Sequence, residues 1–307
     1  MLSTIIVLQI LKLLRLFKLI TQVEYQRYQN NHLKKLMGDT APPQEDDAFQ
    51  WYRNAAKFGI PSAQFLLAVG YSKGRWGEQN QATAVKWYRK AARQGLAEAQ
   101  YNLGLKYELG QGVGQDFVAA VKWHRKAAIQ GLAEAQHNLG FHYSTGQGIA
   151  QDPVEAVKWY RKAAERGWAI SQFNLAVCCA TGQGVAEDQE AAVKWYRKAA
   201  EQGQATAQFN LGVRYQIGRG VAEDQEAAVK WYRKAAEQGY AAAQFWLGVC
   251  YSKGKGVTKD IVTGIKWLRK AAAQGHERAE QLLKSSSSKS AEKDNSAMVA
   301  KTDCAKQ

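Results

Sequence analysis

The chain has 307 residues, only 4 prolines, as many as 10 tryptophans, and a formal net charge of +15 with a pI near 9.6. Its 4 cysteines form no CxxC motif and no periodic pair, which argues against a disulfide-stapled secreted framework and favours reduced thiols. The positive charge is spread along the chain, so it allows an acidic protein, an anionic membrane or a nucleic acid as a partner without choosing among them.

Residues 1–40 form the first predicted domain, a basic amphipathic N-terminal helix. Its apolar stretch contains Lys12, Arg15 and Lys18, which share one side of a helical wheel. Three charges argue against a membrane-spanning helix, and neither the leader nor the cleavage site of a secretory signal is present. The opposite face is predicted to contact an anionic membrane. Its residues are Ile6, Ile10, Leu13, Leu14, Phe17 and Ile20.

Other interpretations of this segment stay open. Its apolar face can pack on the end of the repeats or on a second copy of the chain, and the segment can serve as an uncleaved anchor or an atypical export signal. The reduced thiols favour a cytoplasmic location, with or without membrane association. An exported or periplasmic location through the N-terminal segment is the alternative.

Residues 41–284 form the second predicted domain, in which a 36-residue repeat is evident. Tryptophan recurs at this interval, a glycine follows each tryptophan eight positions later, and glutamine keeps the same register from Gln64 to Gln244. The repeated tryptophans are Trp51, Trp87, Trp123, Trp159, Trp195, Trp231 and Trp267. Such self-similarity predicts a repeat protein whose units are stable only when they stack on their neighbours.

Each unit is predicted to contain two helices. The first is clearest over residues 152–166, where Asp152 is placed to cap the helix and Gly167 suits the left-handed residue that ends it. The second is predicted over residues 205–217. Only Gly or Ala occurs at the position of Gly212 in the other units, which indicates a close approach of two helices without a positive φ.

The pattern AVKWYRKAAEQG followed by AxAQFNLGVxYxxGxGV resembles the Sel1-like repeat, a relative of the tetratricopeptide repeat, over about residues 46–284. The resemblance implies an all-α fold, an α/α right-handed superhelical solenoid of about seven 36-residue helix–turn–helix repeats. It also implies a non-enzymatic protein–protein interaction scaffold or adaptor. Because the first helices of such solenoids line the concave surface, a partner is expected there. Residues 285–307 form the third predicted domain, a disordered polar tail.

The most distinctive candidate site is the repeated sequence Lys-Trp-Tyr-Arg-Lys. Its three cations fall at i, i+3 and i+4, on one side of the first helix, so stacked units predict a basic stripe for a partner protein or peptide, with acidic partners favoured. The candidate residues are Lys122, Arg125, Lys126, Lys158, Arg161, Lys162, Lys194, Arg197, Lys198, Lys230, Arg233 and Lys234. The alternative is local: the cations pair with glutamates at i+4, as Arg197 with Glu201, and the tryptophans bridge neighbouring repeats.

Other functions are less favoured. A nucleic-acid binder shares the basic composition, but acidic residues are interleaved and no nucleic-acid motif occurs. Some cysteine-rich relatives have been linked to β-lactam binding or hydrolysis, yet this sequence lacks a cysteine pair in each unit. The Ser-x-x-Lys spacing that ends at Lys289 lies in the polar tail. The second candidate function is a membrane-associated structural or assembly factor that acts through residues 1–40.

Histidines and cysteines raise the question of a metal site. His124, His137, His142, Cys178 and Cys179 lie in adjacent units. Equivalent positions in neighbouring repeats are expected about 10 Å apart, too far to share a zinc ion. The sequence therefore predicts no catalytic residue, no metal site and no cofactor.

Overall fold

The computed structural model describes residues 45–75 and 77–285, and within these ranges every regular element is a helix. The helices are α3 (Glu45–Lys57), α4 (Pro61–Lys73), α5 (Gln81–Arg93), α6 (Ala97–Leu109), α7 (Phe117–Ile129), α8 (Ala133–Thr145), α9 (Pro153–Glu165), α10 (Ala169–Thr181), α11 (Gln189–Glu201), α12 (Ala205–Ile217), α13 (Gln225–Glu237), α14 (Ala241–Lys253) and α15 (Ile261–Ala272). The predicted all-α fold is confirmed. The predicted N-terminal helix and the tail beyond residue 285 lie outside the described residues.

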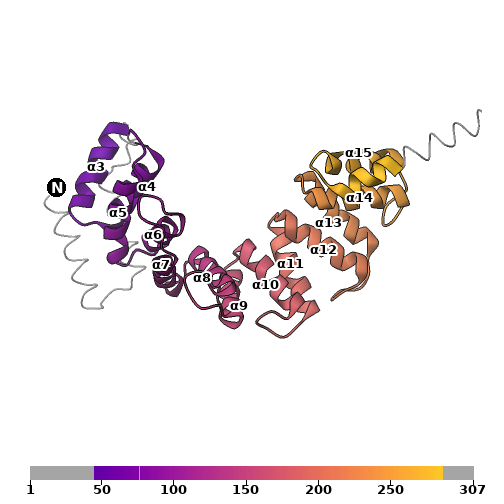
Figure 1. Cartoon of the computed structure of the whole chain (residues 1–307), viewed down its shortest axis with the longest axis horizontal. Coiled ribbons are helices and arrows are strands. Elements are labelled where there is room, and N and C mark those ends of the chain that lie inside the picture. The colour runs from indigo at the N-terminus through magenta and orange to yellow at the C-terminus, as the bar shows by residue number, and fades with distance from the viewer. Residues whose placement is uncertain (1–44, 76, 286–307) are drawn as a thin grey trace, which may run out of the picture. The chain divides into compact units, whose positions relative to one another are not determined.

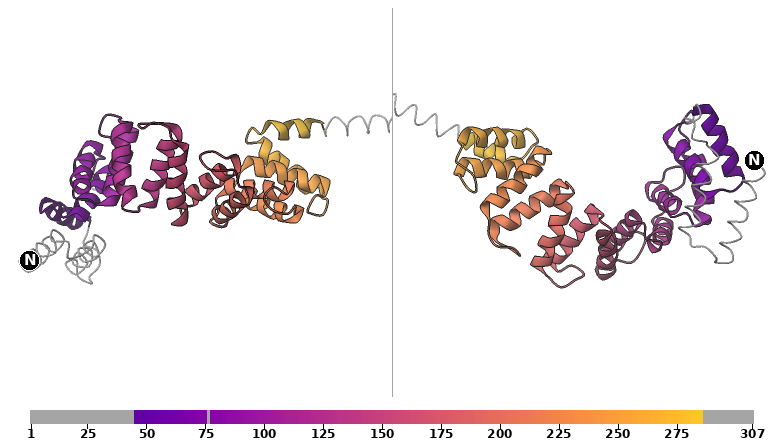
Figure 2. Two further views of the ribbon diagram at one scale, coloured as in Figure 1. Left: turned by 90° about the horizontal axis from the view of Figure 1, so that it is seen from below. Right: turned by 180° about the vertical axis from the view of Figure 1, so that it is seen from behind.

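Two kinds of helix alternate along the chain. We call α3, α5, α7, α9, α11, α13 and α15 the tryptophan helices, because each contains the repeated tryptophan, and α4, α6, α8, α10, α12 and α14 the glutamine helices. The chain divides into two compact units between Leu132 and Ala133, with α3 to α7 in the first and α8 to α15 in the second. Within each unit, consecutive helices pack side by side (Figures 1 and 2).

A side-chain cap begins the tryptophan helices α5, α7, α9, α11, α13 and α15. Asp152, Asp188 and Asp224 each accept a hydrogen bond from the backbone N–H three residues later, over 3.0, 2.9 and 2.9 Å. Asn80, which replaces the aspartate in the first repeat, makes the same bond over 2.8 Å. Because a cap satisfies a backbone donor that the helix itself leaves unpaired, these residues determine where each helix starts.

We expect Asp224→Ala to lower the free energy of unfolding by about 1 kcal/mol, because the N–H of Ala227 loses its acceptor. Urea denaturation of the full chain, followed by circular dichroism, measures the loss. Asp224→Asn is the matched control, since its side-chain oxygen still caps the helix. Equal losses from the two variants would contradict the role of the cap.

The small residues of the glutamine helices allow the following tryptophan helix to approach closely. A Cβ atom added to Gly140 would lie 2.7 Å from the Tyr160 ring, and one added to Gly212 would lie 2.7 Å from the Tyr232 ring. Neither glycine has a positive φ. The predicted close approach is therefore confirmed, and it joins each glutamine helix to the tryptophan helix that comes after it.

Buried glutamines tie neighbouring repeats together. Gln208 is 4% exposed, and its Nε2 donates to the carbonyl oxygen of Ala200 over 3.0 Å. Its Oε1 accepts a hydrogen bond from Nε2 of Gln238, at the end of α13, over 2.8 Å. The same pairing, which we call the glutamine ladder, joins Gln64 to Gln94, Gln100 to Gln130, Gln172 to Gln202 and Gln244 to Gln274. The repeated glutamine thus satisfies buried backbone and links one repeat to the next.

The repeated tryptophans from Trp87 to Trp267 are half-buried. Trp195 and Trp231 pack against one cluster, which contains Leu175 and Leu211. Trp231 belongs to α13, whereas both leucines belong to earlier glutamine helices. Trp231 therefore packs against a cluster that includes side chains of earlier helices.

Candidate partner-binding surface

The twelve candidate cations named above are all exposed. We call the three Lys, Arg and Lys trios of α9, α11 and α13, all in the second unit, the basic stripe, and α7 carries one trio of the same kind in the first unit. The buried face of each helix forces the trio outward. In α11, for example, Val193 and Tyr196 are buried between the exposed Lys194 and Arg197. The sequence prediction of an exposed basic helix face is confirmed, while its use in binding is a separate question.

The last lysine of each trio lies over the tryptophan three residues before it. In the second unit, Nζ of Lys162, Lys198 and Lys234 lies 4.3 Å from the centre of the ring of its tryptophan. Lys126 has the same arrangement at 4.5 Å. At this separation an ammonium is attracted to the ring face and still exposes donors to solvent.

The arginine of the trio donates to a tyrosine of the next glutamine helix. Nη2 of Arg197 lies 2.7 Å from the hydroxyl oxygen of Tyr215, and Nη2 of Arg233 lies 2.6 Å from that of Tyr251. The equivalent bond of α5, from Arg89, is 3.0 Å long. The predicted i, i+4 pairing of these arginines with glutamate is thus not the contact that positions them. The sequence analysis missed this contact, although several repeats have an Arg and a Tyr separated by 18 residues.

The first lysine of the trio points away from the core. Lys158 forms an ion pair with Glu155 on the same helix. The hydrogen bond to Glu155 raises the pKa of Lys158 above its usual value, so this lysine is charged at neutral pH. Because the pair is exposed, it contributes little to stability and a partner can compete for it.

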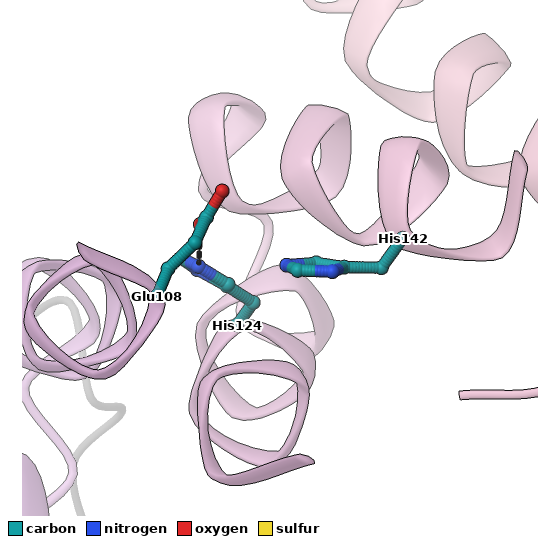
Figure 3. Close-up of side chains that lie close together, drawn as sticks. All are labelled: Glu108, His124 and His142. Carbon is teal, nitrogen blue, oxygen red and sulfur yellow. Dashed lines mark hydrogen bonds and ion pairs between the residues drawn. The ribbon is translucent and has the colours of Figure 1, made fainter. Parts of the chain in front are cut away.

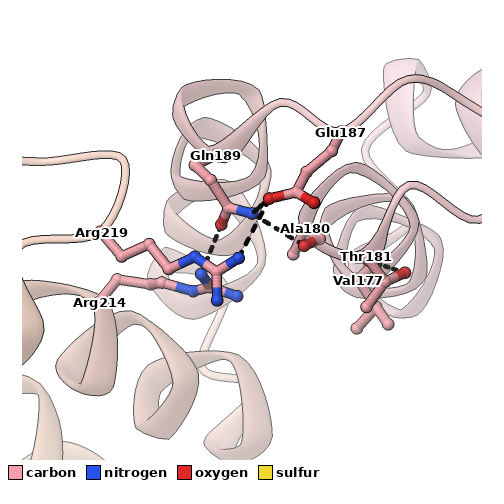
Figure 4. A network of polar contacts seen from close by, with 7 residues as sticks. All are labelled: Val177, Ala180, Thr181, Glu187, Gln189, Arg214 and Arg219. Atoms are coloured by element: carbon pink, nitrogen blue, oxygen red, sulfur yellow. Dashed lines mark hydrogen bonds and ion pairs between the residues drawn. The ribbon is translucent and has the colours of Figure 1, made fainter.

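A network of hydrogen bonds outside the basic stripe links α10, α11, α12 and the loops beside them in the second unit (Figure 4). Nε2 of Gln189 donates to the carbonyl oxygen of Ala180 over 2.8 Å and to Oε1 of Glu187 over 2.6 Å. Nη1 of Arg214 donates to Oε1 of Gln189 over 2.5 Å, and Nη2 of Arg219 donates to Oε1 of Glu187 over 3.0 Å. Arg214 on α12 thus contacts the start of α11, and Arg219 in the loop after α12 contacts the loop before α11.

The three histidines singled out by the sequence analysis are buried or half-buried, and each has a ring nitrogen near an oxygen atom. Nε2 of His124 lies 3.3 Å from Oε2 of Glu108, and a dashed line marks this contact in Figure 3. In the second unit, Nδ1 of His137 lies 2.9 Å from Oγ of Ser171, and burial lowers the pKa of His137 to about 4. His142, also drawn in Figure 3, donates from Nδ1 to the carbonyl oxygen of Gln147 over 3.0 Å.

The cysteines of the described residues are buried free thiols. Burial raises the pKa of Cys178 to about 11, and it also raises the pKa of Cys179 and Cys250. A thiol reacts through its thiolate, so these side chains are poor nucleophiles at neutral pH.

The predicted membrane-contact face, from Ile6 to Ile20, lies outside the described residues. In the part of the chain that the structure describes, no helix is long and apolar enough to cross a membrane.

Comparisons with known proteins agree on one kind of repeat. The family model of the Sel1 repeat matches residues 35–57, 61–96, 97–132, 133–168, 169–204, 205–240 and 241–276. A protective antigen present in uropathogenic Escherichia coli strains, displaying an SLR fold, is 38% identical with a TM-score of 0.74, over 75% of this chain and 50% of that one. A Sel1 repeat protein from Oxalobacter formigenes is 35% identical with a TM-score of 0.62, over 80% of this chain and 94% of that one. No curated protein matches the chain.

The chain spans half the length of the first of these relatives. The matched stretches also define the order of helices in a unit, since 205–240 contains α12 followed by α13. Each full unit of the family model therefore begins with a glutamine helix, whereas the sequence interpretation placed the tryptophan helix first. The two divide the same alternation of helices at different points. Binding along the concave surface stays a prediction.

Proposed function

Because the chain belongs to the Sel1 repeat family, we propose that it is a non-enzymatic scaffold that binds an acidic protein or peptide along the basic stripe. Sel1 repeat proteins are generally protein-interaction scaffolds and typically lack enzymatic activity. The proposal for this chain adds the surface and the chemistry of the partner.

One observation carries this proposal: the contacts that hold the stripe leave its charges available. A lysine over a tryptophan ring retains its charge and its donors, and an arginine that donates once to a tyrosine still has other N–H groups. Holding the lysine side chains over the tryptophan rings reduces the entropy that a partner must remove on binding. The stacking of repeats requires no excess of one sign of charge, whereas recognition of an acidic partner does.

The test is reversal of charge at Arg161, Arg197 and Arg233 together, each to Glu. We expect recovery of bound protein by the full chain to fall at least about tenfold, since three exposed contacts are lost and repulsion replaces them. Affinity capture followed by mass spectrometry measures recovery.

As a control with the same change in net charge, Lys253, Lys255 and Lys259 are each replaced by Glu. These three lysines are exposed and lie outside the stripe. Recovery should be close to that of the unmodified chain. Equal recovery with both triple variants would contradict binding along the stripe. Stronger binding of the unmodified chain to DNA than to acidic protein would instead favour the nucleic-acid function.

Two further hypotheses rest on residues 1–40, which lie outside the described residues. These are membrane association through the N-terminal helix and export through the same segment. Both remain predictions, as does the cytoplasmic location.

A further inference from the structure

Arg161 of the stripe lacks the kind of tyrosine partner that Arg89, Arg197 and Arg233 have. Tyrosine occupies the position 18 residues after Arg89, Arg197 and Arg233, and each of these three arginines donates to its hydroxyl. The residue 18 positions after Arg161 is Cys179. The side chain of Arg161 is exposed.

The backbone at this position is the same as in the other repeats. The N–H of Asp188 donates to the carbonyl oxygen of Cys179 over 2.8 Å, just as the N–H of Asp224 donates to that of Tyr215 over 2.9 Å. The difference therefore lies in the side chain alone. A hydroxyl at the end of a long ring is replaced by a short thiol that is 3% exposed.

The thiol does not replace the tyrosine hydroxyl as an acceptor. Burial, the larger effect, raises the pKa of Cys179, and the charge of Arg161 only partly opposes it. The sulfur is a protonated thiol and accepts hydrogen bonds weakly. Within the described residues, Arg161 thus lies near the thiol of Cys179 and has no strong hydrogen-bond acceptor. Arg197 and Arg233 each have a tyrosine hydroxyl as acceptor.

We propose that Arg161 is the residue of the stripe that binds a carboxylate of the acidic partner; this inference rests on the proposed function. A guanidinium with all its donors available binds a carboxylate through two parallel hydrogen bonds. The exposed neighbours Lys158 and Lys162 add positive charge on either side. In Arg197 and Arg233 an N–H of Nη2 already donates to a tyrosine, so fewer pairs of donors are available for a carboxylate.

The test uses a fluorescein-labelled peptide of ten glutamates and a neutral Gly-Ser peptide of the same length, with binding measured by anisotropy at low salt. The full chain is expected to bind the glutamate peptide and not the neutral one. Arg161→Gln should weaken binding about fivefold, and Arg197→Gln less than about twofold. Both side chains are exposed, and thermal unfolding of each variant checks that the fold is intact.

Two substitutions at Cys179 separate loss of the free guanidinium from a change in packing. Cys179→Tyr restores the hydroxyl acceptor and should weaken binding about as much as Arg161→Gln. Cys179→Phe adds the same ring without the hydroxyl and should leave binding within about twofold of the unmodified chain. In the opposite direction, Tyr215→Phe releases Arg197 and should strengthen binding.

The outcomes separate this inference from the proposed function. If the unmodified chain binds neither peptide, both fail. If it binds the glutamate peptide but Arg161→Gln and Arg197→Gln weaken binding equally, the role of Arg161 fails while the acidic-partner function stands. Equal effects of Tyr and Phe at Cys179 also refute the role of Arg161.

Discussion

Gly220→Ala is expected to lower the free energy of unfolding by about 3 kcal/mol. Gly220 lies in the loop after α12 and has a φ of +75°, which an L side chain adopts only with strain. In addition, a Cβ atom there would collide with the backbone carbonyl of Gln189, the first residue of α11. Because this contact joins two repeats through backbone atoms, neither side can move away cheaply. Urea denaturation of the full chain gives the loss.

Gly203→Ala is the matched control for this prediction. Gly203 has a φ of +91°, and no atom lies within 4 Å of the place where its Cβ would be. This substitution therefore meets only conformational strain, and we expect a loss of about 1 kcal/mol. If the two variants lost the same stability, the contact between the loop and α11 would have no energetic role.

Gln208→Leu is expected to cost about 2–4 kcal/mol, since it breaks the glutamine ladder at a buried position. The leucine matches the volume of the glutamine but leaves the carbonyl oxygen of Ala200 and the amide of Gln238 without this partner. Gln238 is exposed, so water replaces its lost bond, whereas the buried carbonyl oxygen bears the larger penalty.

Chemical denaturation of Gln208→Leu, Gln238→Leu and the double variant tests the coupling between the two residues. Gln238→Leu alone should cost about 1 kcal/mol. The double variant should cost less than the sum of the two single losses, because both remove the same hydrogen bond. Strict additivity would show that the bond contributes nothing to stability.

Local features of the fold were predictable because they depend on neighbouring residues. The helix over residues 205–217 has the predicted bounds, and Asp152 caps α9 as its position indicated. Gly212 faces a packed ring, as the restriction to Gly and Ala at that position implied. In each case the determining interaction is within a helix or between adjacent helices.

The contacts of the candidate site were less predictable. A periodic sequence has no intrinsic starting point, so spacing alone does not show which helix begins a unit. The bonds from Arg197 to Tyr215 and from Gln238 to Gln208 span 18 and 30 residues, and side-chain reach decides them. The different role inferred for Arg161 depends on Cys179. A cysteine at that position is informative only once the hydrogen bonds from Arg197 and Arg233 to their tyrosines are known.

The glutamine ladder also bears on how such a chain changes in length during evolution. Each rung joins a residue to one only 30 positions away, and the same two side chains meet at successive rungs. An in-frame duplication or deletion of one 36-residue unit therefore presents matching partners at the new junction. Recombination can lengthen or shorten this protein while the new junction keeps the existing kind of interface. An insertion of any other length leaves glutamines at the junction without their hydrogen-bond partners.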